Sequence, residues 1–177
     1  MVRFELQPSY PDIFVTDEAG RDAYWVHGPT GRVGRWSLRS LAGGELAAVL
    51  QHGSPFLQRF GIYQRGRLLA VLRELPSPHV PRLAAAAWNA LAGAPRRIRY
   101  AVDTCEGELL WVEGDATRLE YGFTRAGRRT ATVSTRWLAS AAACGVAVTL
   151  ADPADTLLVL AATAAIESSW GRMRYRA

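Results

Sequence analysis

The chain has 177 residues, of which 49% are hydrophobic and 21% charged, so its size and composition fit one ordinary globular domain. A chain of this length folds without disulfides or a structural metal, and its two cysteines, Cys105 and Cys144, exclude a four-cysteine zinc site. The net charge is +5 and all 21 basic residues are Arg, which indicates either an anionic partner or a codon bias against Lys.

No segment has the pattern of a signal peptide or a membrane span. Residues 1–5 contain no apolar core of signal-peptide length. The longest apolar stretch, residues 157–166, is shorter than the roughly 20 residues that cross a bilayer. We therefore expect a cytoplasmic protein with both thiols reduced and no membrane-spanning segment.

The first half of the chain alternates between apolar and polar residues, which predicts β-hairpins. In residues 33–39, for example, Trp36 and Leu38 share one face, while Leu46, Ala48 and Leu50 form the apolar face of the next strand. We expect strands at residues 12–17, 22–28, 33–39, 45–51, 56–65 and 67–74, with turns at Ala19-Gly20, Gly43-Gly44 and Gly66.

A proline-rich bridge separates this half from the next. Pro76, Pro78 and Pro81 exclude a central strand. The alanine-rich residues 82–92, followed by Gly93, predict a short surface helix and its C-terminal cap. Strands are expected again at residues 98–104, 108–113, 119–125, 129–137 and 144–150, with Gly107, Gly114 and Gly127 in the turns between them.

The last predicted element is a helix that is apolar on all sides. Asp152 at the N-cap and Pro153 at the first helical position mark its start, and residues 154–170 are strong helix formers. The apolar side chains of residues 157–162 cover its whole circumference, so the helix must be enclosed on every side. We therefore predict a mainly β protein, an antiparallel closed barrel of about twelve strands around this helix.

A weak internal repeat accompanies these strands. Residues 24–28 resemble residues 110–114, and in both places an aromatic-led strand, a Gly turn and a second strand follow. This favours one domain over residues 1–177 that contains two pseudo-repeats, at about residues 12–75 and 96–170. The alternative is that hairpin sequences resemble one another by chance.

Most of the chain, residues 12–170, resembles the LURP-one-related family of the tubby C-terminal-like and phospholipid-scramblase-like superfamily. The resemblance rests on residues 14–20, on Tyr24-Trp25-Val26 and on the end segment 155–162 with Ile166-Glu167. It implies a twelve-stranded barrel with the C-terminal helix threaded through it. Tubby-like members bind phosphoinositide head groups through basic surface residues, so it also implies an anionic lipid ligand.

Catalytic and metal-binding patterns are missing from the sequence. His27, His52 and His79 have no metal-ligand spacing, and no serine lies in a GxSxG motif. We therefore predict no catalytic residue, no metal and no cofactor. The acidic residues near two turns are expected to form a solvated surface, with a cation site or an acid–base pair as the alternative: Asp103, Glu106, Glu108, Glu113 and Asp115.

Three arginine groups are the candidate ligand-binding residues, because arginine suits phosphate groups. The groups are Arg32, Arg35 and Arg39; Arg96, Arg97 and Arg99; and Arg125, Arg128 and Arg129. They form either one phosphate-binding face or an ordinary solvated surface.

The leading functional hypothesis is a non-enzymatic binding or scaffolding module that meets a protein partner, or meets anionic phospholipid head groups at a membrane surface. A nucleic-acid-binding module is the first alternative, since it uses the same charge together with exposed aromatic residues. A small-molecule carrier or enzyme with a barrel cavity is the second, and the enclosed helix argues against it.

Overall fold

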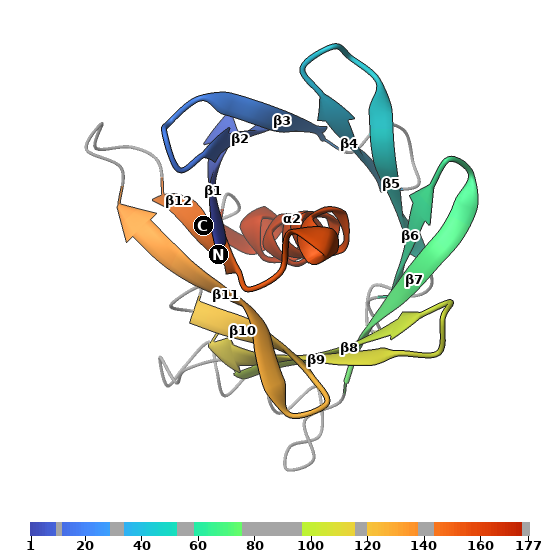
Figure 1. Ribbon diagram of the computed structural model, residues 1–177. Coiled ribbons are helices and arrows are strands. Elements are labelled where there is room, and N and C mark those ends of the chain that lie inside the picture. The colour runs from blue at the N-terminus through green and yellow to red at the C-terminus, as the bar shows by residue number, and fades with distance from the viewer. Residues whose placement is uncertain are drawn as a thin grey trace.

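The computed structural model describes residues 1–9, 12–28, 34–52, 59–75, 97–115, 120–137 and 144–174. In these residues, twelve antiparallel strands form a closed barrel, and one α-helix runs through its middle (Figure 1). The mainly β barrel around a C-terminal helix is thus confirmed. The short helix expected between residues 76 and 95 lies outside the described residues.

Each strand pairs with its neighbours in sequence, and β1 closes the ring by pairing with both β2 and β12. The strands are β1 (Val2–Ser9), β2 (Asp12–Asp17), β3 (Asp22–His27), β4 (Arg35–Ser40), β5 (Glu45–His52), β6 (Arg59–Gln64), β7 (Arg67–Glu74), β8 (Arg97–Thr104), β9 (Leu109–Asp115), β10 (Glu120–Arg125), β11 (Arg128–Trp137) and β12 (Cys144–Leu150). Closure leaves no strand edge unpaired, which removes the surface through which open sheets aggregate.

β1 is absent from the strands predicted above, although its sequence carries the signal. Val2, Phe4 and Leu6 alternate with polar residues, and Phe4 is buried in the core. The predicted repeat at residues 12–75 contains six strands, β2–β7, whereas residues 96–170 contain five, β8–β12. The twelfth strand is therefore β1, which lies outside both predicted repeats.

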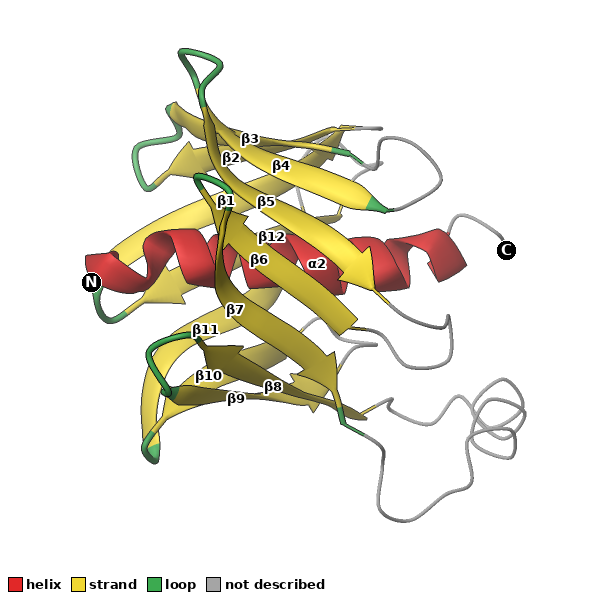
Figure 2. Ribbon diagram, turned by 90° about the vertical axis from the view of Figure 1, so that its right-hand side faces the viewer, coloured by secondary structure: helices red, strands yellow, loops and turns green. Residues whose placement is uncertain are grey.

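Successive strands reverse direction, so the turns that follow the even-numbered strands all lie at one end of the barrel. Figure 2 shows these turns on the left, where the 3-10 turn η1 (Pro153–Asp155) leads into α2 (Thr156–Arg174). We call this the turn end. Each of its five hairpin turns contains a glycine with positive φ, a conformation that side chains with a Cβ disfavour: Gly20, Gly43, Gly66, Gly107 and Gly127.

The helix starts as predicted and is enclosed as predicted. The Asp152 side chain accepts a hydrogen bond from the backbone N–H of Ala154, and Pro153 occupies the first turn. The residues from Leu158 to Ile166 are each at most 8% exposed, whichever side of the helix they lie on. The barrel wall supplies the contacts that a helix with apolar residues all round needs.

Two local predictions are wrong. The core face of β5 is formed by Ala47 and Val49 and not by Leu46, Ala48 and Leu50, because this strand has apolar residues on both faces. Periodicity cannot choose a face in such a strand.

The second error is Gly114, which lies inside β9 and not in a turn. An added Cβ there would meet the backbone of Glu120 and Tyr121 on β10. Glycine at this position therefore permits a close approach of two strands.

Candidate functional site

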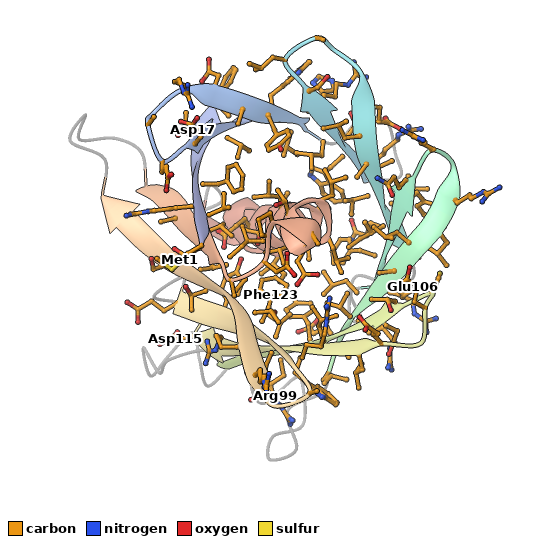
Figure 3. All side chains as sticks on the ribbon, viewed as in Figure 1. Met1, Asp17, Arg99, Glu106, Asp115 and Phe123 are labelled. Atoms are coloured by element: carbon orange, nitrogen blue, oxygen red, sulfur yellow. The ribbon has the colours of Figure 1, made fainter. Side chains whose placement is uncertain are left out.

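The barrel interior is occupied by side chains from α2 and from the wall. Figure 3 shows Phe123 directed toward α2, whereas Arg99 lies at the outside of the wall. Both Phe123 on β10 and Leu160 on the helix are fully buried. A ligand in the middle of the barrel would compete with these side chains, whereas the ends and the outer wall are accessible to one.

A polar contact between Tyr121 and Glu167 links the helix to the wall inside the barrel. The Tyr121 hydroxyl on β10 donates to Oε1 of Glu167 on α2 over 3.1 Å. Burial raises the pKa of Tyr121 well above 10, and the nearby Glu167 carboxylate raises this pKa further. The phenol therefore stays protonated and acts as a donor that fixes the position of the helix.

Arg125, from the third predicted group, closes the turn end. In β10, Arg125 lies on the same face of the strand as the inward-facing Tyr121 and Phe123. Its guanidinium lies 2.7 Å from Oδ1 of Asp155, in η1, and 3.3 Å from Oε2 of Glu108, in the β8–β9 turn. Arg125 thus ties the start of the helix to the wall and is taken up by structural contacts.

Two more predicted arginines are neutralised by carboxylates on the outer wall. Arg35 lies 2.9 Å from Glu45, and Arg99 lies 3.1 Å from Glu113. Both pairs are partly exposed, so they contribute little to stability, but they occupy the cations that a phosphate would need.

Arg39 differs from these residues because its contacts within the described ranges include no carboxylate. Its guanidinium carbon lies 5.5 Å from the centroid of the Trp25 ring, and its Nε donates to Oγ of Ser37 over 3.2 Å. Arg39 is half-buried. Stacking on an aromatic face stabilises the cation and holds its position.

Arg128 and Arg129 are exposed and form no ion pair with the described part of the chain. The Arg129 guanidinium covers Gly122, where an added Cβ would clash with it. Arg32 and Arg96 lie outside the described residues, and Arg97 begins β8 with a side chain that is not described.

The three groups do not converge on one face. β4, which carries Arg35 and Arg39, and β10, which carries Arg125, are six strands apart in a ring of twelve. They therefore lie on opposite sides of the helix, as Figure 1 shows. The described arginines therefore do not form a single phosphate-binding face, and that alternative is wrong for them.

The predicted acidic cluster is also divided. Glu106 and Glu108 lie at the turn end, whereas Asp115 ends β9 at the opposite end of the barrel. Asp103 pairs with Arg73 over 2.6 Å, and this contact raises the pKa of Arg73. Within the described ranges, no group of three His, Cys, Asp or Glu side chains is arranged to hold a metal ion.

The cysteines are separated in the same way. Cys105 is a free, exposed thiol in the β8–β9 turn, whereas the backbone of Cys144 begins β12 at the other end of the barrel. Disulfide geometry needs Cα atoms closer than about 7 Å. The length of a seven-residue strand separates these two positions.

A hollow of about 610 Å³ lies at the turn end, beside residues that Figure 3 labels as Met1 and Asp17. Asp17 accepts hydrogen bonds from the backbone and guanidinium of Arg21, and these bonds lower the pKa of its carboxyl. The lining mixes acidic and basic groups: Met1, Arg3, Asp17, Glu18, Ala19, Gly20 and Thr149.

Sequence reasoning missed one set of turn-end residues. Arg65 and Arg67 flank Gly66 in the β6–β7 hairpin, are exposed, and form no ion pair among the described residues. Leu41, in the β4–β5 turn, is 62% exposed, and Leu68, at the start of β7, is 39% exposed. The sequence carries a signal for these residues, because Arg65 and Arg67 lie beside a turn glycine, Gly66. Arg128 and Arg129, which were predicted, lie beside Gly127 in the same way.

No protein-family model matches the chain, and no curated protein sequence matches it. In the described part of the chain, no helix has the length and apolar character needed to cross a membrane.

Proposed function

We propose that this protein is a non-enzymatic binding module whose turn end associates with membrane surfaces that carry anionic phospholipid head groups. The observation that carries the proposal is the joint location, at that end, of exposed leucines and of arginines that form no ion pair with the described residues. Arg65, Arg67 and Arg128 extend from two hairpins, and Leu41 and Leu68 lie in or next to the turns of the same end.

This combination suits an interfacial contact. Arginine meets phosphate oxygens through several donors, and apolar side chains at the tips enter the boundary between head groups and acyl chains. Each basic residue close to an anionic membrane surface contributes about 1 kcal/mol.

Acidic residues lie on the same end, among them Glu18, Glu106 and Asp152. The attraction is therefore local to the β6–β7 and β10–β11 hairpins and does not extend over the whole end. The occupied interior supports a role through the outer surface, and the barrel around a C-terminal helix is the architecture that the LURP-one-related resemblance implies.

Co-sedimentation with vesicles tests the proposal. We expect binding to vesicles that contain phosphatidylserine and little binding to vesicles of phosphatidylcholine alone. The triple variant R65N/R67Q/R128Q is expected to bind on the order of a hundredfold more weakly, from about 1 kcal/mol per arginine. Asn is chosen at residue 65 because Arg65 has a φ of 49°, which Asn tolerates.

A matched control removes the same charge elsewhere. R35Q/R73Q/R99Q also loses three arginines, but all three are paired with carboxylates on the outer wall. This control is expected to keep most of its binding. Equal losses in the two triple variants, or negligible binding to both kinds of vesicle, would contradict the proposal.

A further inference from the structure

A second surface, on the outer wall of β2–β4, combines aromatic rings with a cation. The strand register places Phe14 opposite Trp25, and Trp25 opposite Arg39. We call these three residues the aromatic row. It runs around the wall, and although Arg39 lies only two residues before Leu41, the row shares no residue with the surface proposed for membranes.

Trp25 and Arg39 are held in place before any ligand binds. The Trp25 indole N–H donates to the carbonyl of Ser40 over 3.2 Å, and the His27 ring meets the indole edge-on at 5.7 Å between centroids. Arg39 is fixed over Trp25 and bonded to Ser37, as described above. Fixed groups lose little conformational entropy on binding.

Two features of the row call for a ligand. Phe14 is 41% exposed although it lies within a strand, so part of its side chain is open to solvent. Arg39 is a half-buried cation, and its cross-strand neighbour Glu45 directs both carboxylate oxygens to Arg35, at 3.1 and 2.9 Å. Among the described residues, the remaining donors of Arg39 therefore meet no carboxylate.

We propose that the aromatic row binds single-stranded nucleic acid, with a base stacked on Phe14 and an adjacent phosphate bonded to Arg39. Aromatic side chains stack with any base, and a neighbouring cation holds the backbone. A net charge of +5 favours the encounter with such a polyanion. A duplex is disfavoured because its base faces are covered by pairing and stacking.

Fluorescence anisotropy with a labelled 15-nucleotide single strand of mixed sequence tests this inference, with the full chain at low salt. We expect F14A and R39Q each to weaken binding by on the order of tenfold, as the loss of one stacked base or one phosphate contact predicts. In R39Q the salt dependence should also become shallower, by about 0.7 in the slope of log affinity against log salt.

Two controls match these variants in chemistry and exposure. Trp111 is 39% exposed on the outer face of β9, on the opposite side of the barrel, so W111A removes a comparable aromatic. R99Q removes one charge, as R39Q does, from an arginine paired with Glu113. Both controls are expected to bind as the unaltered protein does.

Equal effects of R39Q and R99Q would show attraction by net charge alone and would overturn the inference. Binding that F14A leaves unchanged would overturn it too, as would a duplex that binds as tightly as the single strand. The variant R65N/R67Q/R128Q should keep its affinity for the single strand, so the inference stands or falls separately from the membrane proposal.

Discussion

Tyr121 shows how the fold changes the chemistry of a single residue. The sequence around it indicates only a strand, yet its hydroxyl is enclosed beside the Glu167 carboxylate. Ionising this phenol would place a second negative charge in a region of low polarity, which is why its pKa is raised.

This shift predicts a loss of stability at alkaline pH. An unfolded tyrosine ionises near pH 10, whereas folded Tyr121 keeps its proton. The stabilisation is fully present below pH 10 and declines as the pH rises above that value, because only the unfolded state then releases the proton.

Urea unfolding of Y121F and of the unaltered protein tests the prediction. At pH 7 we expect Y121F to be less stable by about 1–2 kcal/mol, since Glu167 loses a donor. Between pH 10 and 12 the unaltered protein should lose stability more steeply than Y121F does. Parallel curves over that interval would show that Tyr121 titrates normally.

Arginine shows the same dependence on surroundings, and this limits what a sequence predicts about a site. Arg35, Arg39 and Arg125 look equivalent along the chain. The fold pairs Arg35 with Glu45, stacks Arg39 on Trp25, and places Arg125 against Asp155 at the mouth of the barrel. Only contacts between different strands and turns distinguish Arg39, which meets no described carboxylate, from Arg35 and Arg125, which are neutralised.

At the scale of elements, α2 is the feature that the sequence specifies best. The N-cap predicts where the helical segment begins, and the apolar circumference predicts that the helix is enclosed. Both predictions are confirmed. Ala161, Ala162, Ala164 and Ala165 are all nearly inaccessible to solvent. Small side chains at these positions let the helix fit within the wall.

We therefore expect enlargement of a buried alanine to be costly. A162L should lower the free energy of unfolding by about 1–3 kcal/mol, because the added atoms must displace packed side chains. Ala154 in η1 is exposed, so A154L is the control and should change stability by less than about 0.5 kcal/mol. Thermal unfolding of both variants measures the difference; equal melting temperatures would mean that the barrel has room around the helix.

The strands were predicted well where glycine marked the turns and less well elsewhere. The five turn glycines limit where each hairpin reverses, so the predicted boundaries around them agree closely with the structure. β5 was given the wrong buried face because both of its faces are apolar. Gly114 was misplaced because glycine serves close strand contacts as well as turns.

At the scale of the whole molecule, closure depends on β1. This strand pairs with β12 over residues 2–6 and with β2 over residues 4–9. Without it, the barrel would have two unpaired edges on either side of an apolar helix.

Deletion of residues 1–9 is accordingly expected to produce aggregation or strand exchange between copies. Size-exclusion chromatography with light scattering would detect the larger species. The control is a ten-residue extension before Met1, which is 92% exposed, and this protein should elute as the unaltered one does. A truncated protein with the elution volume and melting temperature of the unaltered protein would show that β1 is dispensable.

The sequence by itself determined the mainly β architecture, the hairpins and the enclosed helix. These follow from short-range physics: alternation sets which side of a strand is apolar, glycine permits the turns, and a helix that is apolar all round must be covered. Only the tertiary structure decided which strand closes the ring, which arginines remain unpaired, and which aromatic residues stand beside them. Those outcomes depend on the register between neighbouring strands and on the pairing of β1 with β12 from the two ends of the chain, and composition and periodicity specify neither.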